Sequence, residues 1–109
     1  MRQAVIEDPK LAEIVSRLVQ AYEPEKIYLF GSTARGAAGP DSDYDLLVIV
    51  PDSADPEHRR SRLAYQVLRG TATAVDVIVS TRSRFDSRAR VKASLPAAVL
   101  REGKLLHAG

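Results

Sequence analysis

Two aspartates, Asp43 and Asp45, stand two residues apart where a polar segment gives way to an apolar run. Side chains alternate between the two faces of a strand, so both carboxylates share one face if a strand begins here. A third aspartate, Asp76, lies within a valine-rich run that predicts another strand, where an isolated buried charge would be very costly. The alternative is a solubilising charge on an edge strand. If the two strands are neighbours, all three carboxylates converge. Because close carboxylates repel one another, we expect a cation among them.

The expected cation is a hard one. The chain has no cysteine, and its two histidines, His58 and His107, are far apart in the sequence, which argues against a structural zinc site. Oxygen ligands favour magnesium or manganese, and magnesium usually combines carboxylates with water and substrate phosphate. Two such ions can hold the attacking and leaving oxygens of a phosphoryl or nucleotidyl transfer. The carboxylates therefore predict a site for magnesium or manganese, with two Mg²⁺ ions expected, and a phosphate-bearing substrate.

A glycine-rich segment, FGSTARG at residues 30–36, follows the first predicted strand. Gly31 allows close approach of the backbone to a ligand, and a helix that starts at Ser32 or Thr33 would direct free N–H groups at an anion. The Ser32 hydroxyl can donate a further hydrogen bond. The segment lacks the spacing of a Walker loop and of a dinucleotide-binding fingerprint. We therefore predict that Gly31 and Ser32 bind phosphate.

Apolar periodicity, caps and turn residues predict the elements that position these residues. The run at 44–50 is apolar throughout, which is typical of a central strand buried on both faces. The fold class is α/β (α+β), a small mixed sheet flanked by helices in the order αβ(α)βαβα, where the bracketed helix is at most a short turn within residues 32–40. We expect helices over residues 9–22, 55–70 and 94–102, strands over 27–30, 44–50 and 74–79, and a short terminal strand at 105–106.

The composition is that of an ordinary globular domain. The chain has 109 residues, of which 45% are apolar and 28% charged. This length predicts a single domain over residues 1–109, without room for a separate substrate domain. No apolar stretch approaches the roughly 18 to 20 residues that span a bilayer, and the start lacks the apolar core of a signal peptide. We therefore expect a cytoplasmic protein with no membrane partner.

Basic residues are concentrated in the second half of the chain. Residues 58–92 contain nine Arg or Lys but two acids, Asp76 and Asp86. Such a segment can bind nucleic acid, ATP phosphates or an acidic partner surface, or can simply form a solvated face. The sequence leaves these alternatives open for the arginine-rich part, which comprises Arg82, Arg84, Arg88, Arg90 and Lys92.

The combined pattern resembles a known signature. Gly31 and Ser32, ten intervening residues, the segment 43–45 with its two aspartates, and a third acid in the next strand resemble the polymerase-beta-type nucleotidyltransferase superfamily. Within it, the segments GSTARG and SDYDLLV are most similar to the minimal nucleotidyltransferases (MNT), small antitoxins encoded beside HEPN proteins. The resemblance extends over essentially the whole chain and implies the minimal nucleotidyltransferase fold.

The resemblance also implies roles for individual residues. It assigns Gly31 and Ser32 to the triphosphate of ATP, and it assigns Asp43 and Asp45 to magnesium. Asp76 would complete the metal site and help to deprotonate the acceptor hydroxyl. The family's arginine in the same loop corresponds to Arg35, for which a phosphate contact and a structural ion pair are both open.

The resemblance further names a partner. It implies that the chain transfers AMP from ATP to a tyrosine of a cognate HEPN RNase toxin, silences the toxin and forms a hetero-oligomer with it, without direct nucleic-acid binding. Positioning and charge neutralisation supply most of the catalysis in reactions of this class. The alternative is a non-catalytic antitoxin that neutralises the toxin by stoichiometric binding.

Overall fold

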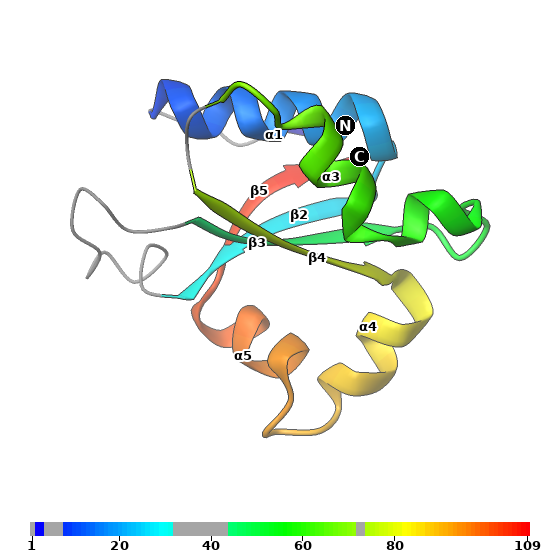
Figure 1. The fold of residues 1–109 in the computed structure, drawn as a ribbon. Helices are drawn as coiled ribbons and strands as arrows, with labels where there is room; N and C mark the ends of the chain where they lie inside the picture. Colours follow the sequence, from blue (N-terminus) through cyan, green and yellow to red (C-terminus); the bar gives the residue numbers. More distant parts are fainter. Residues whose placement is uncertain (1, 4–7, 32–43, 72–73) are drawn as a thin grey trace.

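The computed structural model of the chain describes residues 2–3, 8–31, 44–71 and 74–109. These residues form a mixed β-sheet with helices on both faces (Figure 1). In chain order the elements are β1 (Arg2–Gln3), α1 (Pro9–Tyr22), β2 (Lys26–Phe30), β3 (Tyr44–Val50), η1 (Pro56–Arg59), α3 (Ser61–Val67), β4 (Val75–Thr81), α4 (Arg82–Ala89), α5 (Leu95–Glu102) and β5 (Lys104–Ala108).

The five strands lie in the order β1-β5-β2-β3-β4. Strands β3 and β4 run parallel, and the other neighbouring pairs are antiparallel. The connection from β3 to β4 passes through η1 and α3, as a parallel pair requires a crossover. The predicted mixed sheet with flanking helices is confirmed, while the short helical turn predicted within residues 32–40 lies outside the described residues.

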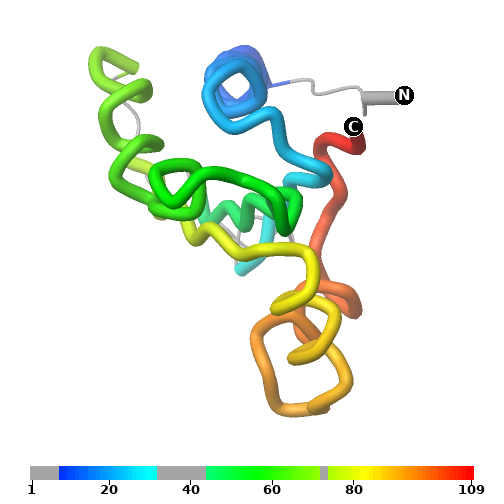
Figure 2. The backbone as a smooth tube through the Cα atoms, turned by 90° about the vertical axis from the view of Figure 1, so that its right-hand side faces the viewer, coloured from blue at the N-terminus to red at the C-terminus, as the bar shows by residue number. Residues whose placement is uncertain are grey.

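Helices α1 and α3 cover one face of the sheet, and α4 and α5 cover part of the other (Figures 1 and 2). Helix α1 begins at Pro9 because the carboxylate of Asp8 accepts a hydrogen bond from the Lys10 N–H at 3.0 Å. Its apolar residues recur at three- and four-residue intervals, which places them against the alternate residues Leu46 and Val48 of β3. On the opposite face, the ring of Phe85 stacks on Tyr28 with a centroid separation of 6.0 Å.

Several elements differ from the expectations. Helix α4 occupies the start of the arginine-rich segment, where we predicted no helix. The sequence did not reveal it because the segment has no apolar periodicity, and in the structure Phe85 is the one residue of the helix that is buried. The helix expected over 55–70 divides into η1 and α3, separated at Arg60, whose extended backbone interrupts the helical path. The terminal strand is longer than predicted and lies inside the sheet, between β2 and the unpredicted β1. None of the helices in the described part of the chain is long and apolar enough to cross a membrane.

His107 of β5 is buried in the sheet, with 4% of its surface exposed. Burial lowers the pKa of its imidazole below the ordinary value, and a hydrogen bond with the Pro24 backbone opposes this shift only in part. The Nδ1 atom of the ring has no hydrogen-bond partner among the described residues. The fold therefore favours the neutral ring.

This burial predicts that the free energy of unfolding falls on acidification. Below about pH 6.5 the unfolded chain binds a proton at His107 that the folded chain resists, so stability decreases until the pH passes below the folded-state pKa. Urea unfolding at a series of pH values between about 7.5 and 5 measures this slope for the wild type and for His107→Leu. We expect a shallower slope in the variant, and two parallel curves would contradict the prediction.

Candidate functional site

Asp45 and Asp76 lie on neighbouring strands and in direct register. Asp45 is the second residue of β3, and Asp76 is the second residue of β4, its parallel neighbour. Residues paired in register on adjacent strands point to the same face, and their strands lie about 4.8 Å apart. The predicted convergence of these two carboxylates therefore agrees with the observed pairing.

The end of β2 supplies the third part of this arrangement. Phe30 pairs with Asp45 across the antiparallel β2–β3 ladder, and Gly31 follows it directly. Gly31 has a φ of +78°, a conformation that favours glycine, and a Cβ atom at this position would lie 2.5 Å from the Oδ2 atom of Asp45. The missing side chain at Gly31 thus allows the Asp45 carboxylate to pack directly against the backbone at this position.

The two acids occupy the face of the sheet that α4 and α5 cover only in part. Two residues further along each strand, on the same face, Leu47 is buried while its partner Ile78 is 43% exposed. Phe30 and Tyr28 belong to the same face, since they pair with Asp45 and Leu47. The result is an open ledge on β3 and β4 that carries Asp45, Asp76 and Ile78.

The predicted burial of Asp76 is wrong. We predicted a carboxylate enclosed by a valine-rich strand, but β4 is an edge strand and Asp76 is exposed. The valines at 75, 77 and 79 face the core on α1 and α3, whereas the opposite face of β4 is open. The burial of Asp76 therefore supplies no argument for a cation, and the case for this residue depends on its register with Asp45.

Three of the predicted site residues lie outside the described part of the chain: Asp43, Ser32 and Arg35. Among the described residues, no group of three or more metal-ligating side chains is close enough to hold an ion. The pair of Asp45 and Asp76 offers carboxylate oxygens, which are the donors that magnesium prefers. The space that a Cβ at Gly31 would fill lies against one of these oxygens. The described donors are therefore chemically suited to magnesium.

A contact that the sequence did not reveal holds the start of β3. The Tyr44 hydroxyl donates a hydrogen bond to the carboxylate of Asp8, the residue that caps α1. This hydrogen bond lowers the pKa of Asp8 and raises the pKa of Tyr44 to about 12, with desolvation of the tyrosine adding to the latter shift. Tyr44 packs against the core on the face of β3 opposite Asp45. The contact ties α1 to the strand that carries Asp45.

We expect Tyr44→Phe to lower the free energy of unfolding by about 1 to 2 kcal/mol at neutral pH, because hydrogen bonds to charged groups contribute at this level. The pKa of Asp8 is depressed in the fold, so this stabilisation is present above the unfolded pKa of about 4 and is lost as the pH falls through the folded value. Urea unfolding at about pH 7 and about pH 3 should show a difference between variant and wild type that shrinks at the lower pH.

Tyr65→Phe is the matched control for this measurement. The Tyr65 hydroxyl accepts a hydrogen bond from the Val77 N–H at 3.3 Å, so its partner is neutral. Its loss should change stability equally at both pH values. If Tyr44→Phe behaves in the same way, the charge on Asp8 is not what stabilises the contact.

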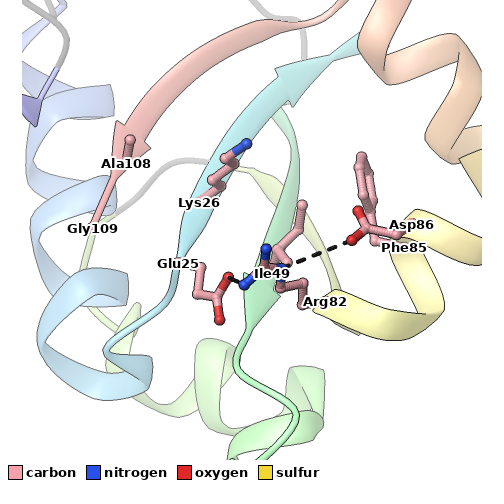
Figure 3. Close-up of a pocket in the computed structure, with 8 residues that line it drawn as sticks. All are labelled: Glu25, Lys26, Ile49, Arg82, Phe85, Asp86, Ala108 and Gly109. Atoms are coloured by element: carbon pink, nitrogen blue, oxygen red, sulfur yellow. Dashed lines mark ion pairs between the residues drawn. The ribbon is translucent and has the colours of Figure 1, made fainter.

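A separate hollow of about 230 Å³ lies at the other end of this face (Figure 3). Ile49, which lines it, is four residues beyond Asp45 on β3, a separation of about 13 Å along a strand. Arg82 lies between Glu25 and Asp86 and forms ion pairs with them at 3.7 and 3.8 Å. Its charge is thus directed at side chains of this chain, and the hollow is remote from the two acids.

Comparisons with known proteins agree with the fold. Residues 9–102 match the family described as Nucleotidyltransferase domain. A protein described as a nucleotidyltransferase from Sulfolobus solfataricus is 27% identical, with a TM-score of 0.57 over 88% of this chain and 75% of that chain. No curated protein sequence gives a significant match.

Two further solved structures that resemble this chain are toxin–antitoxin complexes. One contains AMP-PNP and is 27% identical, with a TM-score of 0.57 over 89% of this chain and 73% of that chain. The other is a substituted form of the MntA–HpeT complex and is 26% identical, with a TM-score of 0.55 over 90% of this chain and 72% of that chain.

Proposed function

The chain belongs to the nucleotidyltransferase domain family, and from this premise we propose that it is an MNT antitoxin that transfers AMP from ATP to a tyrosine hydroxyl of a cognate HEPN toxin. The family match confirms the prediction of a nucleotidyltransferase. The observation that carries the proposal is the register of Asp45 with Asp76, with the Asp45 carboxylate packed against the backbone at Gly31. The presence of AMP-PNP in one related toxin–antitoxin complex supports ATP as the substrate and a toxin as the partner.

The proposed reaction is a displacement at the α-phosphorus of ATP. The acceptor oxygen forms a bond to phosphorus, the bond to the bridging oxygen of pyrophosphate breaks, and the acceptor proton passes to the Asp76 carboxylate. Asp76 suits this role because it is exposed on the ledge, where an acceptor on another molecule can approach. Gly31 and Ser32 hold the triphosphate, with Arg35 as a further nucleotide-binding residue.

Asp43, Asp45 and Asp76 are the residues that would hold two Mg²⁺ ions. When bound, magnesium neutralises charge on the phosphates and orients the attacking and leaving oxygens. Strand β3, whose other face is buried in the core, holds the Asp45 carboxylate next to Gly31, the proposed phosphate-binding glycine. This placement on a sheet keeps the carboxylates in a defined geometry before substrate binds.

The proposal places the protein in the cytoplasm, where ATP and an RNase toxin would meet, in a hetero-oligomer with the toxin. It is tested by incubating the chain with α-labelled ATP, magnesium and the HEPN protein encoded beside it. We expect label on the HEPN protein and loss of its RNase activity. Neutralisation without label on any protein would contradict AMP transfer.

The second candidate is an antitoxin that acts only by stoichiometric binding. It predicts that an Asp43→Asn/Asp45→Asn variant still neutralises the HEPN protein at equal concentration. AMP transfer predicts that this variant fails to neutralise at substoichiometric amounts, at which the wild type still acts. A titration of both forms against a fixed amount of the HEPN protein separates the two mechanisms.

A further inference from the structure

Helix α4 and its connection to α5 present a group of cations, Arg84, Arg88, Arg90 and Lys92, which we refer to as the basic corner. All four are exposed, and none forms an ion pair with a described residue. Figure 2 shows this part of the chain projecting from the sheet on the side opposite α1. Residues 82–92 contain five Arg or Lys and a single acid, Asp86, which is paired with Arg82.

The position of Arg84 in helix α4 is electrostatically unfavourable. Arg84 lies in the first turn, where the positive end of the helix dipole repels a cation. Arg84 and Arg88 stand four residues apart, and like charges at this spacing destabilise a helix. Helix α4 has one buried side chain, Phe85, so packing offers little compensation. Arg84 and its repulsion with Arg88 therefore reduce the stability of the free helix, although Arg88 itself lies in the last turn, where the helix dipole favours a cation. This cost suggests that Arg84 serves an interaction.

The corner is nevertheless well ordered by hydrogen bonds. The Ser94 hydroxyl donates to the Arg88 carbonyl at 2.6 Å, and the Ala97 N–H donates to the Ser94 Oγ at 3.2 Å. The guanidinium of Arg101, in α5, donates to the Lys92 carbonyl at 3.2 Å. The backbone that carries the cations is therefore held in one conformation, which lowers the entropic cost of binding a partner.

The basic corner also contains an apolar hollow. The hollow has a volume of about 320 Å³ and is lined by Ser87, Arg88, Val91, Ala93 and Ser94. Val91 is 59% exposed, and the neighbouring Leu95 is also exposed. An apolar centre surrounded by charged side chains is the usual organisation of a protein–protein interface.

We propose that the basic corner docks a carboxylate-rich surface of the HEPN toxin, with an apolar side chain of the toxin entering the hollow. The inference rests on the proposed function and deepens it by assigning the surface that receives the partner. A protein fits this surface better than RNA does, because single-stranded RNA is bound through exposed aromatic rings. The aromatic residue of α4, Phe85, is buried against Tyr28.

The test measures the affinity of the HEPN protein for Arg88→Glu/Arg90→Glu and for the matched control Arg62→Glu/Arg69→Glu. The control makes the same charge change at exposed arginines on and just beyond α3, on the other face of the sheet. We expect Kd to rise roughly tenfold or more in the first variant, because each reversal replaces attraction by repulsion. The control should stay within about twofold of the wild type, and added salt should weaken the wild-type complex.

A second variant and a second ligand complete the test. Arg88→Gln/Arg90→Gln removes charge without adding any, and it should weaken binding by a smaller factor than the glutamate pair. Equal binding by all three variants and the wild type would overturn the inference and leave the proposed function intact. Wild-type protein that neither binds nor labels the HEPN protein would refute both. Tighter binding of the basic corner to a uridine oligonucleotide than to the HEPN protein would assign it to RNA instead.

Discussion

Asp45→Asn should reduce transfer of label from α-labelled ATP to the HEPN protein by roughly a thousandfold or more, because a charge that is positioned in advance in an active site contributes at this level. The substitution keeps the shape of the side chain and replaces one carboxylate oxygen by an NH₂ group. Asp45 stands in register with Asp76 and beside Gly31, so no other described carboxylate replaces it on β3. Single-turnover labelling at saturating ATP measures the effect on the chemical step.

Urea unfolding should show that the variant remains cooperatively folded, since Asn has nearly the shape of Asp. The matched control is Asp86→Asn, an identical chemical change on α4, where the carboxylate pairs with Arg82. The control should retain wild-type labelling. Full activity in Asp45→Asn would mean that the aligned carboxylates are not the catalytic centre.

Helix α1 and strand β3 were predictable because their patterns are local. An aspartate cap, a proline in the first turn and apolar residues on one face predict residues 9–22, and the helix occupies these residues. The apolar run at 44–50 likewise coincides with β3, which is central in the sheet. Helix α4 lacks such periodicity. The feature of the sequence that could have indicated this helix is Thr81 as an N-cap residue. Its hydroxyl accepts a hydrogen bond from the Arg84 N–H at 3.4 Å and caps the helix.

The order of the strands was not predictable in the same way. A valine-rich segment is compatible with a central or an edge strand, and the choice depends on which distant segment pairs with it. Among the described strands, β4 pairs with β3 alone, and Asp76 is exposed although its sequence context indicates burial. The register with Asp45 follows from the parallel pairing. From the sequence, the convergence of Asp45 and Asp76 could be predicted only on the condition that the two strands are neighbours.

Gly31→Ala should lower AMP transfer by roughly a hundredfold or more, because a displacement of about 1 Å at a reacting group can cost this much. The added Cβ would lie 2.5 Å from the Oδ2 atom of Asp45, so either the carboxylate must rotate or the end of β2 must shift. Both movements separate the carboxylate from the backbone that is proposed to hold the triphosphate. Labelling of the HEPN protein measures the loss, and urea unfolding measures the accompanying change in stability.

Gly70→Ala separates the effect of the contact from the effect of backbone strain. Gly70 has a φ of +86°, similar to the +78° of Gly31, but a Cβ there meets no atom within 4 Å. Both substitutions should therefore lower the free energy of unfolding by about 1 to 2 kcal/mol through the left-handed backbone alone. Only Gly31→Ala should lose activity, because only its Cβ displaces the Asp45 carboxylate. Equal activity in the two variants would show that the close packing of the Asp45 carboxylate against Gly31 is not needed for the reaction.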